Sequence, residues 1–254
     1  MSPQTGGVPE DTKARRPHWT TRAAVLLPSP TATPFTFWYL AVLLATTILQ
    51  RVVGESVSAK LLAGASTDAH NLWHRPVASL VSSALWIENS GWLVYVLIFA
   101  LAVAPLERRV GPGWTFGVFA SGHVLATLAT ELPVMVALRH GWLPAEDAHW
   151  LDIGVSYGFF ATAGAMVPVL EKRLRLPAVV LLELVIGVIY LFDQPGSLLS
   201  VVTVAGHAIA AHIGMLAWLP WLRRRGLVGT LRLPRRVKSD PVRPDAPLAD
   251  SISQ

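Results

Sequence analysis

Six apolar blocks occupy most of this 254-residue sequence, and they constrain its fold more than any other feature. They cover roughly 35–53, 88–106, 113–137, 151–170, 176–192 and 198–222. Each block is near the length of about 20 residues that an α-helix needs to cross a bilayer. Charged residues make up only 15% of the chain, against about 25% in average soluble domains. The sequence therefore predicts an all-α, polytopic membrane bundle with six transmembrane helices.

Positive charge is concentrated on one predicted side of this bundle. Short cytoplasmic loops of membrane proteins carry an excess of lysine and arginine. If six spans place both termini in the cytoplasm, all but four of the 21 lysines and arginines lie on that side, the exceptions being Arg51, Lys60, Arg75 and Arg139. We therefore expect a multi-pass protein of the plasma membrane with both termini cytoplasmic. The net charge of +5 then reflects topology and attraction to lipid headgroups rather than binding of nucleic acid.

The segments outside the spans suggest three regions. Residues 1–33 are polar, basic and proline-containing, without the apolar core and cleavage site of a signal peptide. Residues 223–254 are rich in arginine, proline and aspartate and show no apolar period. We expect both to be disordered cytoplasmic tails around a membrane domain at 34–222. The outside connection at 54–87 is too long for a simple link and predicts short interfacial helices.

Ionisable and hydroxyl side chains at bilayer depth are costly and are therefore candidates for function. The predicted spans contain His123, Glu131, Asp152, Ser156, Glu183, His207 and His212. No metal-ligand spacing links them, and the chain has no cysteine, so we expect neither a metal nor a cofactor. A proton-linked carrier using His123, Glu131 and Glu183 is one interpretation, although no inverted repeat is visible in its support.

Ser156 stands at the start of the fourth block, in the stretch 152–158, Asp-Ile-Gly-Val-Ser-Tyr-Gly. The apolar run after it stops at Glu171 and is close to the minimum for crossing a bilayer. We expect this helix to begin below the outer membrane surface, beside a water-filled recess.

Small residues on the fourth and sixth blocks predict that these two helices pack closely. Those of the fourth are Gly158, Ala161 and Gly164, and those of the sixth are Ala210 and Gly214. Ala210 and Gly214 share a helix face with His207 by their i, i+3 and i+7 spacing. Close packing would bring the Ser156 hydroxyl within hydrogen-bond range of the His207 imidazole. Serine needs such a base to act as a nucleophile near neutral pH.

Other interpretations of these residues remain open. His212 is the competing base, but it is rotated by about 140° from His207 around an α-helix, so only one of them faces Ser156. We favour His207. Asp152 is expected mainly to cap the fourth helix, and Ser156 alone would be read as an interhelical hydrogen-bonding residue.

This arrangement resembles the rhomboid family of intramembrane serine proteases, whose GxSG motif heads a short fourth helix and whose sixth helix supplies a histidine. The resemblance runs from about Trp73 to Trp218. Gly154-Val155-Ser156 matches Gly-x-Ser, and 206–214 is similar to the histidine helix. The sequence Leu-Glu-Arg-Arg-Val-Gly at 106–111 looks like the family's leucine-glutamate-x-x-x-glycine turn. Trp73-His74-Arg75 loosely matches the tryptophan-arginine feature of the first outer loop.

Two departures from the family pattern concern the oxyanion. The family's second-helix histidine and asparagine fall at Gly91 and Tyr95, or at Val94 and Ile98 if the frame shifts by three residues. Tyr95 would offer one hydroxyl. Tyr157 replaces the glycine that follows the nucleophile.

The resemblance implies a protease that cleaves the transmembrane helices of single-span membrane proteins, with Ser156 as nucleophile and His207 as base. Gly154, Tyr157, Tyr95 and Asp152 would be its supporting residues. The two departures favour an alternative, an inactive rhomboid-like protein that binds transmembrane helices as clients without cutting them.

Overall fold

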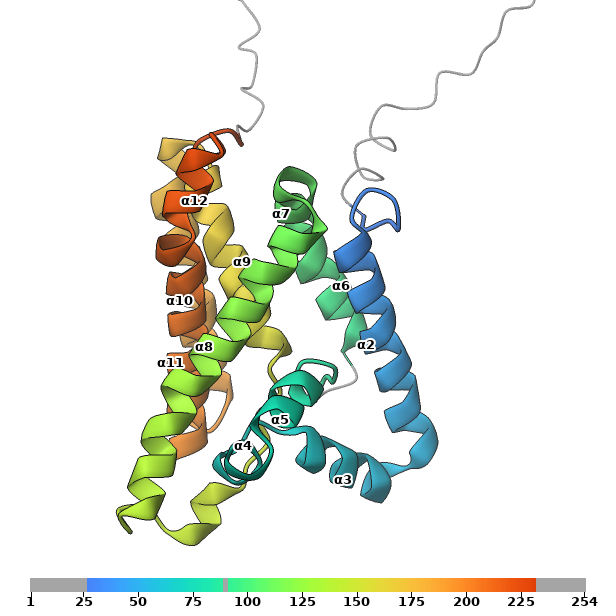
Figure 1. The fold of residues 1–254 in the computed structure, drawn as a ribbon, viewed down its shortest axis with the longest axis vertical. Helices are drawn as coiled ribbons and strands as arrows, with labels where there is room; N and C mark the ends of the chain where they lie inside the picture. The colour runs from blue at the N-terminus through green and yellow to red at the C-terminus, as the bar shows by residue number, and fades with distance from the viewer. Residues whose placement is uncertain (1–26, 89–90, 232–254) are drawn as a thin grey trace, which may run out of the picture.

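The computed structural model describes residues 27–88 and 91–231, and the described chain is helical throughout, apart from turns and one isolated bridge (Figure 1). The helices are α2 (Pro34–Val53), α3 (Glu55–Ala65), α4 (Ala69–His74), α5 (Pro76–Ser83), α6 (Trp92–Leu101), α7 (Val103–Val110), α8 (Pro112–Arg139), η1 (Ala145–Ala148), α9 (Val155–Val169), α10 (Lys172–Phe192), α11 (Leu198–His212), η2 (Ile213–Ala217) and α12 (Leu219–Arg224). Among the described residues, four helical stretches, 34–53, 112–139, 172–192 and 198–224, are long and apolar enough to cross a membrane. The predicted all-α membrane bundle is confirmed.

The second and sixth predicted spans are each interrupted. The second consists of α6 and α7, which meet at Ala102, where the backbone leaves helical geometry. The sixth consists of α11, a π-helical turn (η2) and α12. A π-turn widens the helix locally and is often found at functional sites.

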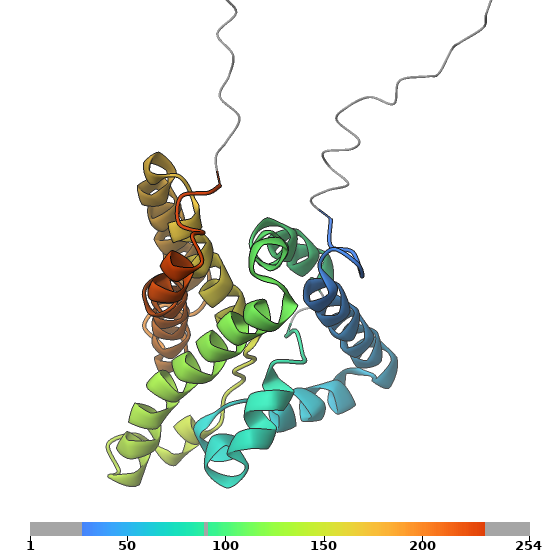
Figure 2. The same ribbon diagram turned by 45° about the horizontal axis from the view of Figure 1, so that its top comes forward.

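α9 lies at the centre of the fold, between α8 and α11, and most of its side chains are buried. Its 15 residues give a length of roughly 22 Å, which is less than the ~30 Å hydrocarbon core. α8 crosses diagonally between the group α9 to α12 and the group α2 to α6 (Figures 1 and 2). A short, surrounded helix of this kind can hold polar groups away from lipid.

Backbone contact of α9 with α11 and with the adjoining η2 turn depends on small residues. A Cβ added to Gly164 would lie 2.0 Å from the carbonyl oxygen of Ala211, and one added to Gly214 would lie 1.8 Å from that of Ala161. Ala161 and Ala210 are fully buried in the same cluster. Gly158 faces α8 instead, because an added Cβ there would strike the Phe119 ring.

The connection at 54–87 forms three short helices, α3, α4 and α5, as the sequence predicts. Arg75 holds their turns together, since its Nη2 donates to the carbonyl of Gly64 and to Oδ1 of Asn71, both at 2.8 Å. This arginine belongs to the Trp73-His74-Arg75 motif and has a structural function here.

The leucine-glutamate motif attaches α2 to the bundle. The buried carboxylate of Glu107 accepts hydrogen bonds from the backbone N–H groups of Phe35 and Thr36, at 2.7 and 2.9 Å, and from the Thr36 hydroxyl at 2.6 Å. Glu107 therefore satisfies first-turn donors of α2 that have no partner within their own helix.

The chain after α12 returns to the end of α9. Gly229 donates to the carbonyl of Pro168, and Leu231 exchanges backbone hydrogen bonds with Val169 and Glu171. The predicted tail at 223–254 thus includes residues 223–231, which the structure places in and after α12. The rest of that prediction, and residues 1–26 of the predicted N-terminal tail, lie outside the described residues.

Candidate active site

Ser156 lies in the first turn of α9 and is partly exposed. Gly154 is the N-cap, and no side chain accepts from the first-turn amides. The Ser156 hydroxyl makes no hydrogen bond to any residue that the structure describes. The residue is therefore a free hydroxyl beside the uncapped, partially positive end of a helix.

His207 lies on the face of α11 that contacts α9. It is 3% exposed, and neither of its ring nitrogens has a hydrogen-bond partner among the described residues. Its ring is held by Phe160 and Tyr157, at centroid distances of 4.5 and 5.3 Å. Phe160 is four residues after Ser156, so the two lie one helical turn apart on the same side of α9. The packing thus places the His207 ring against Tyr157 and Phe160 of α9, and no hydrogen bond in the described structure joins it to Ser156.

Tyr157 separates α9 from α11 near Ser156. Its side chain is 1% exposed, and a Cβ added to Gly206 would lie 2.4 Å from its hydroxyl oxygen. The tyrosine hydroxyl has no partner in the described structure. The backbone of α9 touches α11 at Gly164 and η2 at Gly214, but at the level of His207 an aromatic ring lies between α9 and α11.

His212 lies on another side of α11. Its Nδ1 donates to the carbonyl of Ala208 at 2.8 Å, and it is 4.0 Å from Oε1 of Glu183 on α10. Roughly half of its side chain is exposed. Of the two histidines weighed as a base, His207 is the one buried against α9.

Asp152 does not cap α9. Its Oδ2 accepts from the Thr67 hydroxyl at 2.9 Å, and its backbone N–H donates to Oγ of Ser66 at the same distance. Thr67 also donates its backbone N–H to the Asp152 carbonyl at 3.0 Å. Since the capping position belongs to Gly154, the expectation of a capping aspartate is wrong. Asp152 instead ties the segment before α9 to the segment between α3 and α4.

His123 contacts the Gly-x-Ser motif, although its sequence position suggests an isolated residue. Its Nε2 lies 2.8 Å from the Leu80 carbonyl, which only accepts, so this nitrogen carries a proton. A Cβ added to Gly154 would lie 2.2 Å from its Nδ1. The glycine of the motif is therefore needed for the close approach of an imidazole from α8. No spacing in the sequence could reveal this contact, because α8 and α9 meet only in the tertiary structure.

The remaining candidates have separate surroundings. Tyr95 packs in an apolar cluster that includes Phe99 and Val155, and Gly91 is the N-cap of α6. Oε1 of Glu131 accepts from the Trp150 indole at 3.2 Å. Within the described residues, no three histidine or acidic side chains are grouped so that they could hold a metal ion.

A family model described as rhomboid-like protein matches residues 31–227, which include α2 to α12 and both candidate residues. The chain belongs to the rhomboid-like family. Neither the curated proteins nor the solved structures include a match to it. Family membership supports the helical fold and a membrane location.

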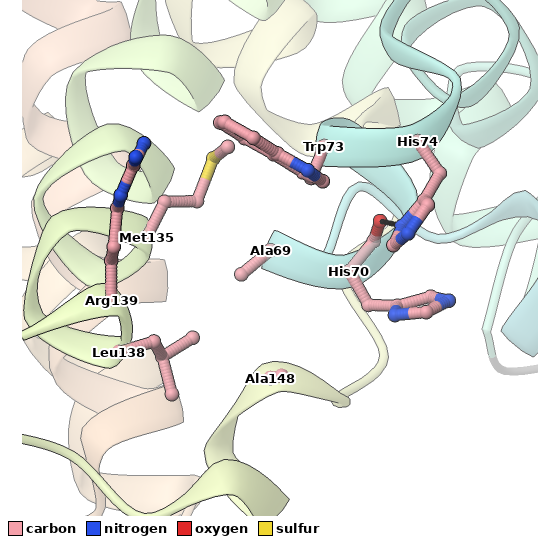
Figure 3. A pocket seen from close by; sticks show the side chains of 8 residues that line it. All are labelled: Ala69, His70, Trp73, His74, Met135, Leu138, Arg139 and Ala148. Carbon is pink, nitrogen blue, oxygen red and sulfur yellow. Dashed lines mark hydrogen bonds between the residues drawn. The ribbon is translucent and has the colours of Figure 1, made fainter. Parts of the chain in front are cut away.

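This rhomboid-like protein also has a small pocket of about 300 Å³ between α4 and the end of α8 (Figure 3). Trp73 of α4 faces Met135 and Arg139 of α8 across it, and the Arg139 guanidinium lies 5.9 Å from the Trp73 ring centre. His70 and His74 lie at its rim, joined by a hydrogen bond from His74 Nδ1 to the His70 carbonyl. No lining residue comes from α9 or α11, so this pocket is separate from Ser156 and His207.

Proposed function

We propose that this rhomboid-like protein is an intramembrane serine protease in which Ser156 is the nucleophile and His207 the general base. The observation that carries the proposal is the state of His207. A buried imidazole with two unpaired nitrogens is unfavourable for folding, and native structures tolerate such groups mainly where they serve a function.

The chemistry follows from the two side chains. His207 takes the proton of the Ser156 hydroxyl as its oxygen attacks the scissile carbonyl, and then gives that proton to the leaving amine. Water, activated by the same imidazole, releases the acyl group from the serine. Since no hydrogen bond joins the two residues in the described structure, this step requires a rearrangement at Tyr157 that brings the imidazole to the hydroxyl.

The oxyanion has donors even without a second-helix pair. The first-turn N–H groups of α9 have no side-chain cap, and such amides at a helix N-terminus favour negative charge. At Gly91 and Tyr95, the two positions that align with the family's second-helix histidine and asparagine, only Tyr95 has a side-chain hydrogen-bond donor, its hydroxyl. Since loss of one oxyanion donor typically costs about 10²–10³ in rate, we expect slow turnover.

The proposed substrates are single-span membrane proteins whose helix unwinds near its outer end and is presented from the side of the bundle. The proposed location is the plasma membrane, with both termini in the cytoplasm. The length of α9 supports lateral presentation, because a helix of roughly 22 Å is shorter than the ~30 Å hydrocarbon core, so one of its ends would lie below a membrane surface.

A second function, binding of transmembrane clients without cleavage, is favoured by one specific observation. The buried Tyr157 ring lies between α9 and α11 beside the unpaired His207. If this ring does not move, the base never reaches the serine, and the fold only recognises helices.

One experiment separates these two functions. Purified full-length protein is incubated in liposomes with a fluorogenic single-span substrate and, separately, with a fluorophosphonate probe. We expect cleavage and labelling by the wild type and by His212→Ala, and neither by Ser156→Ala or His207→Ala. The protease proposal fails if the wild type does not exceed Ser156→Ala while an active rhomboid protease does under the same conditions. Crosslinking of the uncut substrate would then support the client-binding function.

A further inference from the structure

The outer side of α10 has a glutamate where a membrane helix is expected to be apolar. α10 lies at the edge of the bundle beside α11 (Figures 1 and 2). Only 6% of its most apolar stretch is buried, the smallest share among the four candidate spans of the described chain. Counted from Lys172, Glu183 is the twelfth of the 21 residues of α10, and 42% of its side chain is exposed. The glutamate therefore lies near the middle of a span, on a surface that would otherwise face lipid.

His212 of α11 lies beside Glu183 at a similar depth. It is the fifteenth of the 27 residues in the stretch 198–224. Its Nδ1 lies 2.8 Å from the Ala208 carbonyl, which only accepts, so this nitrogen carries a proton. The 4.0 Å between Nδ1 and Oε1 of Glu183 is too long for a hydrogen bond, and no described residue donates one to this carboxylate. Glu183 thus has unsatisfied oxygens at a depth where no water replaces a partner.

The surface around Glu183 has the shape that a neighbouring helix needs. It has a depression of about 580 Å³ whose lining residues all belong to α10. Gly187, one turn after Glu183, lies in this depression, and an added Cβ there would meet nothing within 4 Å. A small residue at such a place lets another backbone approach closely. Exposed apolar side chains lie beside these two residues, and the Glu183 face is defined by all six: Val180, Glu183, Leu184, Gly187, Val188 and Leu191.

We propose that the Glu183 face binds the transmembrane helix of a partner protein that has a lysine or arginine near the middle of its span. A carboxylate only accepts hydrogen bonds, and a neutral His212 imidazole has only the acceptor Nε2 left. The occupant must therefore bring donors, and a cationic donor also compensates the charge of the carboxylate. A second copy of this chain related by a two-fold axis would place the same acceptors against each other. The proposal goes beyond the proposed protease function and does not depend on it.

The Glu183 face is separate from the side of α10 that faces α6. Gly187 and Ala178 are nine residues apart, so they point in opposite directions at about 100° per residue. Ala178 lines a groove together with Ile98 and Leu101 of α6. A helix bound over Gly187 therefore lies on the outside of the bundle, away from this groove.

The test uses purified full-length protein in phosphatidylcholine liposomes and a synthetic transmembrane helix of about 20 residues, made of leucine and alanine with one central lysine. Binding is measured by energy transfer from a dye on Glu146→Cys, the single cysteine of the chain, to a dye on the peptide. We expect the lysine peptide to bind about tenfold more tightly than a peptide with a central leucine. Glu183→Gln should weaken binding of the lysine peptide by about tenfold, the size of an interhelical polar contact in model peptides.

Matched variants separate the Glu183 face from other surfaces. Gly187→Leu fills the depression and should weaken binding, whereas Ala178→Leu, on the opposite side of α10, should change it by less than about twofold. Glu55→Gln removes an exposed carboxylate of α3 and should also stay within about twofold. Glu183→Lys should lose the lysine peptide and bind a peptide with a central glutamate, and thermal unfolding of each variant shows that it is folded.

Three results would overturn the proposal. Equal binding of the lysine and leucine peptides would remove the role of charge. Loss of binding in Ala178→Leu but not in Gly187→Leu would place the peptide on the α6 side of α10. Energy transfer between two labelled copies of the protein that disappears in Glu183→Gln would make a second copy of this chain the occupant.

Discussion

At the scale of single residues, the carboxylate of Glu107 is the main polar link between α2 and the rest of the bundle. Glu107→Ala would leave two backbone N–H groups and the Thr36 hydroxyl without their acceptor in a buried place. Unsatisfied donors that formerly bonded to a charged group each cost about 1–3 kcal/mol. We expect a loss of about 3 kcal/mol in unfolding free energy, measured by denaturant titration in detergent. Glu55→Ala, an exposed glutamate in the first turn of α3, should stay within about 0.5 kcal/mol of wild type.

His207 provides the opposite case, a buried polar residue whose removal should stabilise the fold. Its nitrogens have no partners in the described structure, and an apolar side chain of similar size would pack between Phe160 and Tyr157 without that penalty. We expect His207→Leu to raise the unfolding free energy by about 1 kcal/mol and to abolish hydrolysis. A destabilised His207→Leu protein would show that the imidazole has a structural hydrogen bond, and would remove the main argument for a catalytic base.

At the scale of elements, the contact between α9 and α11 positions the candidate site. Gly164→Ala would place a methyl group 2.0 Å from the Ala211 carbonyl oxygen, and backbone cannot move aside as a flexible side chain can. Overpacking of this kind costs about 1–3 kcal/mol or more. Gly187→Ala on α10, where an added Cβ meets nothing within 4 Å, should be neutral or gain about 0.5 kcal/mol from helix propensity. Thermal unfolding of both variants compares the two positions, and equal stability would contradict the close α9–α11 contact.

At the scale of the whole molecule, the orientation in the membrane can be measured directly because the chain has no native cysteine. Glu146 in η1 and Lys172 at the start of α10 are both exposed. Of these two residues, the predicted topology places only Lys172 on the basic, cytoplasmic side. We expect a membrane-impermeant maleimide to label Glu146→Cys in intact cells and Lys172→Cys only after lysis. The reverse pattern would contradict cytoplasmic termini.

The sequence by itself determined the helical spans, the family and the choice of Ser156 and His207, because these depend on apolar length, charge placement and short motifs. It also identified Gly164 and Gly214 as small residues that could face a partner helix. Such properties are local along the chain, so a single sequence reveals them.

Only the tertiary structure decided what surrounds those residues. It placed Tyr157 between α9 and α11, His123 against Gly154 and the Asp152 carboxylate on Thr67 rather than at a helix cap. It also left His207 without a partner and placed Glu183 beside His212 on the outer side of α10. These are contacts between segments far apart in sequence, and their geometry follows from how whole helices pack, which no local pattern encodes.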